Sequence, residues 1–230
     1  EIFYKKNFPI DHYVCNFNET LGVNNLVDLS RVNNEFQKIK RRSFLTKGVI
    51  MEAPDTVYFS YDTKIGKNVT IQPNVYFGPK VEINDNVVLR SFSYLDNVRI
   101  DQNVLIGPYA RIRDGVNIKK NSKIGNFVEI KKSKIDKNVK ISHLSYIGDS
   151  IINSDSNIGA GTITCNYDGK NKNKTVIKNK VFVGSNSSLV APVTLNEKST
   201  IGAGSVITKN VKKNSLALTR SNQSEVKNYK

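Results

Sequence analysis

His143 is the residue of this sequence best suited to proton transfer. An imidazole has an unperturbed pKa near 6.5, so it can take a proton from a reacting group at neutral pH. His143 lies in the segment 141–169, ISHLSYIGDSIINSDSNIGAGTITCNYDG, which also contains the small residues Gly159, Ala160 and Gly161. The only other histidine is His12, and two histidines cannot form a three-histidine zinc site. We therefore interpret His143 as a general base.

A six-residue repeat should position this histidine. Aliphatic or aromatic residues recur at every sixth place from Ile65 onward, for example at Ile71 and Phe77. Hexads with Asn in the fourth place, such as INDNV at 83–87 and IDQNV at 100–104, begin 17 or 18 residues apart. Three hexads thus form one coil, and the sequence predicts an all-β fold, a parallel β-helix of about eight coils. The first and fifth positions should point inward, while Asn and Gly suit the corners because they tolerate positive φ.

The segments on either side of the repeat differ from it in pattern. Residues 22–48 predict a linker helix with an apolar stripe that contains Leu26, Leu29 and Ile39. Residues 1–21 include an alternating run at 12–17 that predicts a strand, and they resemble the tail of a domain whose body lies upstream. We expect the solenoid to occupy residues 49–211 and a C-terminal tail to occupy residues 212–230.

The repeat breaks once, between Cys165 and Thr175. The extra residues, CNYDGKNKNKT, must leave the solenoid as a loop. Long loops on rigid scaffolds often carry function. The alternative is a polar insertion without a role.

The coil register predicts a column of small side chains that begins at His143. Ala160, Ser185 and Ala203 occupy the same place as His143 in the next three coils, at about 4.8 Å per step. Such a strip would form a shallow channel for a long, thin ligand such as a pantetheine arm. Alternatively, small residues merely suit a corner.

A pair of cations is predicted on the third side of the coils. Arg113 and Lys131 occupy equivalent places one coil apart, Tyr146 lies on the same face, and Glu129 stacks above Tyr146. We expect no carboxylate between the two cations, so a phosphate would relieve their repulsion. The alternative is two solvated basic side chains in a lysine-rich protein. We expect the cation pair to lie around the same corner as His143 and the channel.

Composition narrows the possible partners. The formal net charge of +15 comes from lysines scattered among asparagines, without the basic stripe and interleaved aromatics typical of nucleic-acid binding. The simplest interpretation is a solvated surface rich in lysine and asparagine. Positive charge also suits anionic substrates such as phosphates and coenzyme A. No apolar run approaches the roughly 18 residues of a membrane span, and no leader pattern opens the sequence. Cys15 and Cys165 are far apart, which predicts free thiols in a reducing cytoplasm.

Several motifs together resemble one family. They are GPYARIR at 107–113, GNFVEIKKS at 125–133, SHLSYIGD at 142–149, NIGAGTITCNYDGKNKNKT at 157–175, VFVGSNSSLVAPVT at 181–194 and IGAGSVITKNV at 201–211. The chain resembles the bifunctional N-acetylglucosamine-1-phosphate uridylyltransferase/glucosamine-1-phosphate N-acetyltransferase family in its C-terminal acetyltransferase domain. GVNN at 22–25 is similar to the end of the uridylyltransferase domain, so residues 1–21 would be its remnant.

The resemblance implies a left-handed β-helix in a homotrimer, with sites between subunits. It implies acetyl transfer from acetyl-CoA to glucosamine 1-phosphate, in UDP-N-acetylglucosamine biosynthesis for peptidoglycan and lipopolysaccharide. His143 is similar to the family's general base. Positions similar to its sugar-phosphate ligands are Arg113, Lys131, Tyr146 and Asn157, and those similar to its acetyl-CoA ligands are Ala160, Asn166, Tyr167, Ser185, Ala203 and Arg220.

The sequence departs from the family in its first domain. Asn24 is similar to a Mg²⁺ and sugar-nucleotide ligand, but the Gly-rich nucleotide loop is missing, so we expect no uridylyl transfer from this chain. Two alternatives remain open: a hexapeptide-repeat acyltransferase with another acceptor, and a non-catalytic β-helix that serves as a binding platform.

Overall fold

A computed structural model describes residues 2–6, 8–9 and 11–227. The chain divides into two compact units, Glu1–Lys40 and Arg41–Lys230. The first unit contains α1 (Ile2–Lys5), the 3₁₀ helix η1 (Phe17–Thr20) and most of α2 (Leu26–Thr46). The strand predicted at 12–17 is wrong: residues 11–16 have no regular structure and are exposed. An alternating pattern forms a stable strand only beside a partner, and every described strand belongs to the second unit.

Helix α2 lies inside the predicted range of 22–48. At its start the Asn25 Oδ1 accepts the backbone N–H of Asp28 at 2.9 Å, and the Asp28 carboxylate accepts the N–H of Asn24 at 3.1 Å. This reciprocal cap satisfies backbone donors that a helix start leaves free. Gly48, at φ +86°, follows the last turn. The predicted apolar stripe is largely exposed, with Leu26 at 82% and Ile39 at 62%.

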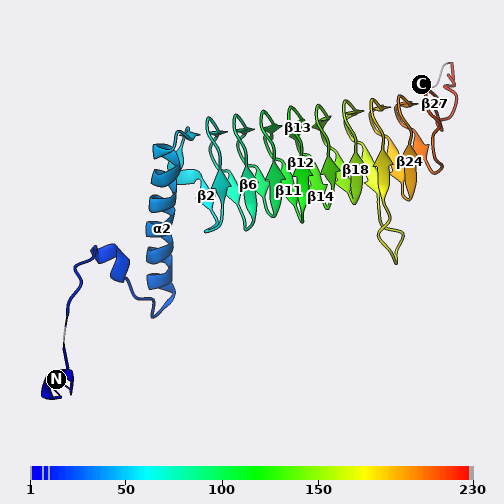
Figure 1. Ribbon diagram of the computed structural model, residues 1–230. Coiled ribbons are helices and arrows are strands. Elements are labelled where there is room, and N and C mark those ends of the chain that lie inside the picture. Colours follow the sequence, from blue (N-terminus) through cyan, green and yellow to red (C-terminus); the bar gives the residue numbers. More distant parts are fainter. Residues whose placement is uncertain (1, 7, 10, 228–230) are drawn as a thin grey trace. The chain divides into compact units, whose positions relative to one another are not determined.

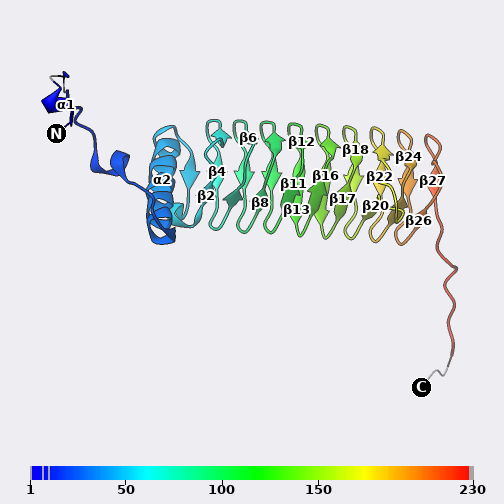
Figure 2. The same cartoon turned by 90° about the horizontal axis from the view of Figure 1, so that it is seen from below.

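The second unit is a solenoid in which each turn adds one strand to each of three parallel sheets (Figures 1 and 2). The first sheet orders β1 (Ile50–Met51), β4 (Thr70–Ile71), β7 (Val88–Leu89), β10 (Leu105–Ile106), β13 (Lys123–Asn126), β16 (Lys140–His143), β19 (Asn157–Ile158), β22 (Phe182–Val183), β25 (Thr200–Ile201) and β27 (Leu216–Ala217). The second orders β2 (Tyr58–Phe59), β5 (Tyr76–Phe77), β8 (Tyr94–Leu95), β11 (Arg111–Arg113), β14 (Glu129–Lys131), β17 (Tyr146–Gly148), β20 (Ile163–Cys165), β23 (Ser188–Val190) and β26 (Val206–Ile207). The third orders β3 (Lys64–Ile65), β6 (Val81–Ile83), β9 (Val98–Ile100), β12 (Val116–Ile118), β15 (Lys134–Ile135), β18 (Ser150–Ile152), β21 (Thr175–Ile177) and β24 (Val193–Leu195).

The predicted hexapeptide β-solenoid is confirmed. The sheets have ten, nine and eight strands, so there are about nine turns where the repeat predicted about eight. The additional turn is the first, with β1, the 3₁₀ helix η2 (Pro54–Thr56) and β2. It lies before Ile65, where the Asn-containing hexads begin.

The repeat explains the core. The first and fifth positions of the hexads point inward, and Ile71, Val75 and Phe77 are at most 1% exposed. Asparagines at the corners adopt positive φ, for example Asn103 and Asn121 at 59° and 61°. Their side chains continue from turn to turn as a hydrogen-bonded ladder, with Asn103 Nδ2 3.2 Å from Asn121 Oδ1. Each turn is therefore fixed against the next both inside and at the corner.

Candidate active site

The predicted column exists as a line of residues along one corner, where the first sheet gives way to the second. The pairings of Ile141 with Ile158, Ile158 with Val183 and Val183 with Ile201 set its register. The members in order are His143, Ala160, Ser185 and Ala203. Backbone hydrogen bonds join the turns beside them, such as Asn186 N–H to the Ala160 carbonyl at 2.7 Å. The stacking order is as predicted, and the roles of these residues remain predictions.

Two glycines beside this column allow the backbones of successive turns to approach each other closely. A Cβ on Gly159 would lie 2.6 Å from the Ser185 nitrogen, and one on Gly184 would lie 2.5 Å from the Ala203 nitrogen. Successive backbones thus approach more closely than any side chain allows. Arg220 reaches the end of the column, where its Nη1 donates to the Ala203 carbonyl at 3.1 Å. A long ligand laid along the column would run from an imidazole to a guanidinium.

His143 has one side-chain partner that the sequence reasoning missed. Its Nδ1 is hydrogen-bonded to Oδ1 of Asn126, which occupies the same place one turn earlier. The ring is otherwise exposed, and the His143 carbonyl accepts the Ser145 hydroxyl at 2.9 Å. The signal was available in the register, because the column extends back from His143 to Asn126 as well as forward to Ala160.

The predicted bare pair of cations is wrong, because two carboxylates accompany Arg113 and Lys131. Glu129 accepts from Arg113 Nε at 2.9 Å and pairs with its Nη2 at 2.8 Å. Asp114 lies 2.7 Å from Arg113 Nη1 and 3.8 Å from Lys131 Nζ. Asp114 follows Arg113 at φ 62°, and Glu129 reaches diagonally across the sheet, so neither contact follows from the register of the two cations alone.

These contacts leave Arg113 firmly charged. Burial lowers the pKa of its guanidinium, but the hydrogen bond and charge of Glu129, together with Asp114, more than offset this, so the net pKa is raised. Lys131 lies beside Arg113 in the sheet, and Gly148 follows Lys131. Arg113 and Lys131 thus lie side by side at the C-terminal ends of β11 and β14, where Glu129 and Asp114 orient their side chains.

Tyr146 and Asn166 meet above Gly148. A Cβ on Gly148 would lie 2.6 Å from the Tyr146 hydroxyl and 2.7 Å from Asn166 Nδ2, so only glycine leaves room for both side chains. Asn166 is 5% exposed, and its Nδ2 donates to the Asp149 carboxylate at 2.5 Å. Tyr146, Asn166 and the two cations therefore share one face.

The predicted loop leaves the solenoid between Cys165 and Thr175 (yellow in Figure 1). Its centre is Asp168, whose carboxylate accepts Lys170 N–H at 2.8 Å, Asn171 N–H at 2.7 Å and Asn173 Nδ2 at 2.8 Å. The N–H of Asn171, followed by the other donors, lowers the pKa of Asp168. Lys172 Nζ lies 4.0 Å from the centre of the Tyr167 ring, which shapes the loop further.

The predicted residues are gathered at two corners, whereas the sequence placed histidine, channel and cations at one. His143 precedes the second-sheet strand β17, while Arg113 and Lys131 align with Gly148 at its end. The path from His143 to Gly148 is up to about 17 Å along the backbone. Asn157 lies apart from both groups, outward on the first sheet between Lys140 and Phe182. One chain thus contains two separate groups of predicted site residues.

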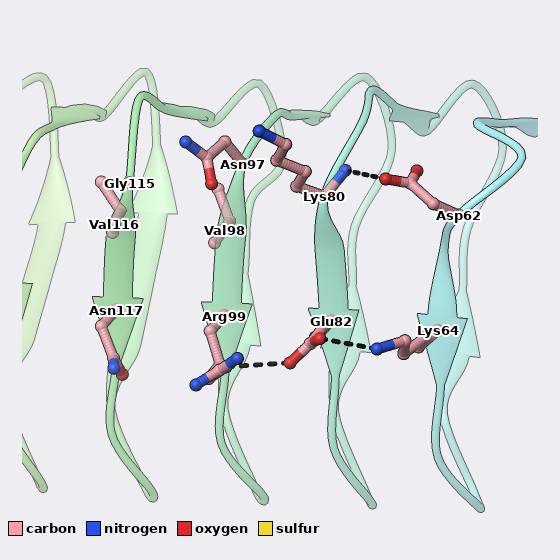
Figure 3. Close-up of a pocket in the computed structure, with 10 residues that line it drawn as sticks. All are labelled: Asp62, Lys64, Lys80, Glu82, Asn97, Val98, Arg99, Gly115, Val116 and Asn117. Carbon is pink, nitrogen blue, oxygen red and sulfur yellow. Dashed lines mark hydrogen bonds and ion pairs between the residues drawn. The ribbon is translucent and has the colours of Figure 1, made fainter.

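A groove of about 490 Å³ lies elsewhere, on the third sheet (Figure 3). Glu82 is central to it and pairs with Lys64 at 3.0 Å and Arg99 at 2.9 Å. The backbone N–H of Lys80 donates to Asp62 at 2.8 Å. Glu82, Lys64 and Arg99 are thus already paired with each other, and no predicted site residue lines the groove. We therefore interpret these ion pairs as surface contacts that join successive turns.

Neither a metal-binding cluster nor a membrane-spanning helix occurs in the part of the chain that the structure describes. Within residues 2–6, 8–9 and 11–227, no three His, Cys, Asp or Glu side chains gather as a metal site. The described helices include none that is long and apolar enough to cross a membrane. The backbone N–H of Asn24, the predicted magnesium ligand, donates to the Asp28 carboxylate at the start of α2. These two residues do not form a magnesium site by themselves.

The fold and repeat define the chain as a parallel β-solenoid built from hexapeptide repeats. The family described as bacterial transferase hexapeptide (six repeats) matches residues 62–97 and 174–209, and the GMPPB C-terminal domain matches residues 94–184. Among solved structures, LpxA from Bacteroides fragilis 9343, a UDP-N-acetylglucosamine acyltransferase, has a TM-score of 0.64. The two sequences are 19% identical, and the match covers 70% of this chain and 69% of the LpxA chain. The likeness therefore concerns the fold.

The chain is a homologue of the proteins named bifunctional protein GlmU. It is 53% identical to that of Zymomonas mobilis over 205 residues, which are 89% of this chain and 46% of the relative. It is 46% identical to that of Wolbachia pipientis wMel over 222 residues, which are 96% of this chain and 52% of the relative. The chain therefore spans about half the length of these relatives.

Proposed function

We propose that this chain transfers the acetyl group of acetyl-CoA to the amine of glucosamine 1-phosphate. The observation that carries this proposal is the column headed by His143, in a homologue of bifunctional proteins. The product, N-acetylglucosamine 1-phosphate, would enter UDP-N-acetylglucosamine synthesis in the cytoplasm. Uridylyl transfer, to which Asn24 would contribute as a Mg²⁺ ligand, would require the part of the relatives that this chain does not cover.

In this mechanism His143 is the general base. Its Nε2 takes a proton from the substrate amine as the nitrogen attacks the thioester carbonyl. The new N–C bond forms, the C–S bond breaks, and coenzyme A leaves as a thiolate that can take the proton from the imidazolium. Backbone N–H groups along the corner would stabilise the oxyanion.

The remaining predicted residues bind and orient the substrates. Arg113 and Lys131 would hold the sugar phosphate, with Glu129 and Asp114 keeping the cations in place, and Tyr146 and Asn157 would contact the sugar. Ala160, Ser185 and Ala203 would line the acetyl-CoA arm. Arg220 would bind a coenzyme A phosphate at its far end, and Asn166 and Tyr167 would contact acetyl-CoA from the loop.

We further propose that the active protein is a homotrimer of left-handed solenoids with sites between neighbouring chains. The separation of the two groups of predicted residues supports this arrangement, because each group would then be half of a site. The corner of His143 on one chain would face the corner of Arg113 and Lys131 on the next. Each interface would then complete one site.

The proposal is tested by His143→Ala, with His12→Ala as the matched control. Thiol release from acetyl-CoA in the presence of glucosamine 1-phosphate should fall at least about 10²-fold in His143→Ala and stay unchanged in His12→Ala. Acetyl-CoA binding should persist in both variants. Near-normal thiol release by His143→Ala would refute the base assignment. An acceptor panel in which another amine or hydroxyl compound outperforms glucosamine 1-phosphate would refute the acceptor assignment.

A further inference from the structure

The environment of the His143 ring is unusually simple. Its Nδ1 faces the Oδ1 of Asn126, and no ion pair joins a carboxylate to the ring within the described part of the chain. The neighbour on the other side of the column is the uncharged Ala160. Charged or titratable groups on the packed strands are Lys123 and Lys140 on β13 and β16, and, past the corner, Glu129 and Tyr146 on β14 and β17.

Asn126 is itself held firmly. It aligns with His143 in adjacent strands, and its carbonyl accepts the N–H of Leu144 at 3.0 Å. Before it, Gly125 lets the two backbones approach, because a Cβ there would lie 1.9 Å from the Ser142 carbonyl oxygen. The amide is half-buried, and its oxygen is hydrogen-bonded to the His143 ring.

We infer that Asn126 is the positioning residue that sets the tautomer of His143. An amide oxygen only accepts hydrogen bonds, so the Nδ1 opposite must carry the ring proton. The lone pair is then on Nε2, which points away from Asn126 and is available to take the substrate's proton. This inference rests on the proposed role of His143 as a base. It goes beyond that role because it says which nitrogen acts and what holds it.

An amide also differs from a carboxylate in this place. A carboxylate would stabilise the imidazolium and raise the ring pKa, whereas a neutral oxygen orients the ring with less effect on its charge. Asn126→Ala should therefore lower kcat by about 10- to 100-fold while leaving both KM values within about twofold. Asn126→Asp should retain orientation and shift the acidic limb of the kcat/KM profile to higher pH.

The tautomer can be measured without turnover. Long-range ¹H–¹⁵N spectra of the full chain carrying His12→Gln report one imidazole, since the sequence has two histidines. We expect protonated Nδ1 and unprotonated Nε2 in the parent chain, and a mixture of tautomers in Asn126→Ala. Asn84→Ala, an exposed asparagine of the third sheet, should change neither the spectrum nor kcat.

The two hypotheses fail differently. If Asn126→Ala keeps the single Nδ1–H tautomer, or keeps the parent kcat, the positioning role is overturned. If the parent chain shows the expected tautomer but transfers no acetyl group, the positioning of the ring stands and the proposed function falls.

Discussion

At the scale of single residues, Gly148 is buried and Gly159 is half-buried, and a side chain at each position would meet a different kind of atom. A Cβ on Gly148 would meet the ends of two side chains, Tyr146 and Asn166, which can move. A Cβ on Gly159 would meet backbone atoms of residues 183–185 at 2.6–2.7 Å, which cannot. The same substitution should therefore have different consequences in adjacent turns.

Gly148→Ala should damage function more than stability, and Gly159→Ala the reverse. We expect Gly159→Ala to cost about 1–3 kcal/mol in urea unfolding, as overpacking does. Gly148→Ala should cost less and should raise the KM for glucosamine 1-phosphate by roughly tenfold, because Tyr146 and Asn166 are displaced. Equal destabilisation by the two variants, with an unchanged KM in Gly148→Ala, would contradict this reading.

Asp136 provides a pH-dependent contact on the third sheet. The hydroxyl of Ser154 donates to its carboxylate at 2.6 Å, and this bond, aided by the Lys137 N–H and outweighing burial, lowers the pKa of Asp136. A lowered pKa stabilises the fold above the unfolded value near 3.9, and the contribution disappears as pH falls through the folded value.

Ser154→Ala should therefore destabilise the folded protein at neutral pH but not in strong acid. We expect a melting temperature roughly 2–4 °C below the parent at pH 7, from one lost charge-assisted hydrogen bond. The gap should close as pH falls below about 3, because Asp136 is then protonated in both proteins. Melting curves across this range measure it, and a gap that is constant with pH would argue against Asp136 as the partner.

At the scale of elements, the loop between β20 and β21 is ordered by its own aspartate. Asp168 is exposed, yet three donors from within the loop converge on it. Its lowered pKa means that this order is complete above the unfolded value near 3.9 and is lost as pH falls through the folded one. The loop is thus preformed at neutral pH, which lowers the entropy cost of binding a ligand.

Asp168→Asn should loosen the loop at neutral pH. The loop contains Lys170, Lys172 and Lys174, so trypsin should cut the variant there several times faster than the parent. Acetyl-CoA affinity should fall with it, while the melting temperature of the solenoid holds. Asp155→Asn removes the same charge from a corner and is the control. If trypsin cuts the parent and Asp168→Asn at the same rate, Asp168 does not order the loop.

The sequence predicted the repeating strands, helix α2 and the loop between Cys165 and Thr175, and it missed the first turn. Inward positions every six residues place nearly every strand, because each turn makes the same contacts as the next. The first turn, around Tyr58 and Phe59, lacks the Asn-containing hexad, so the repeat counted from Ile65 did not include it. The same limit applies to the site. Register placed Ala160 beside His143, but the reach of Glu129 across the strand to Arg113 depends on a side-chain conformation that no spacing encodes.

At the scale of the whole molecule, one corner carries exposed apolar side chains in an unfavourable conformation. Phe92, Tyr109, Phe127 and Leu144 have φ values of 50–60°, where the other corners mostly use asparagine. The first three rings stack at 4.9 and 5.0 Å, and all four side chains are 47–61% exposed. Left-handed backbone costs about 1–2 kcal/mol at such residues. The line adjoins Asn126 and His143, so a second copy that covers it would also reach the proposed base.

Phe127→Asn should weaken the proposed trimer without weakening the chain. Asparagine accepts the left-handed backbone more readily than phenylalanine, so the single chain should be as stable as before or slightly more so. The apolar area that a neighbouring chain would bury is lost, and the association should weaken. Sedimentation equilibrium measures this directly: the parent should have three times the 25.8 kDa of one chain, and the variant should dissociate on dilution.

Lys80→Asn is the matched control for this experiment, because Lys80 also has a left-handed backbone, at φ 57°, but lies in the third-sheet groove. Lys80→Asn should likewise lower the cost of the left-handed backbone, and its sedimentation mass should equal that of the parent. If each site requires two chains, acetyl transfer by Phe127→Asn should fall with dilution in parallel with its mass, while Lys80→Asn stays active. If Phe127→Asn dissociates but keeps full activity, a single chain forms the complete site. If Phe127→Asn keeps the parent mass, this corner does not lie in the interface.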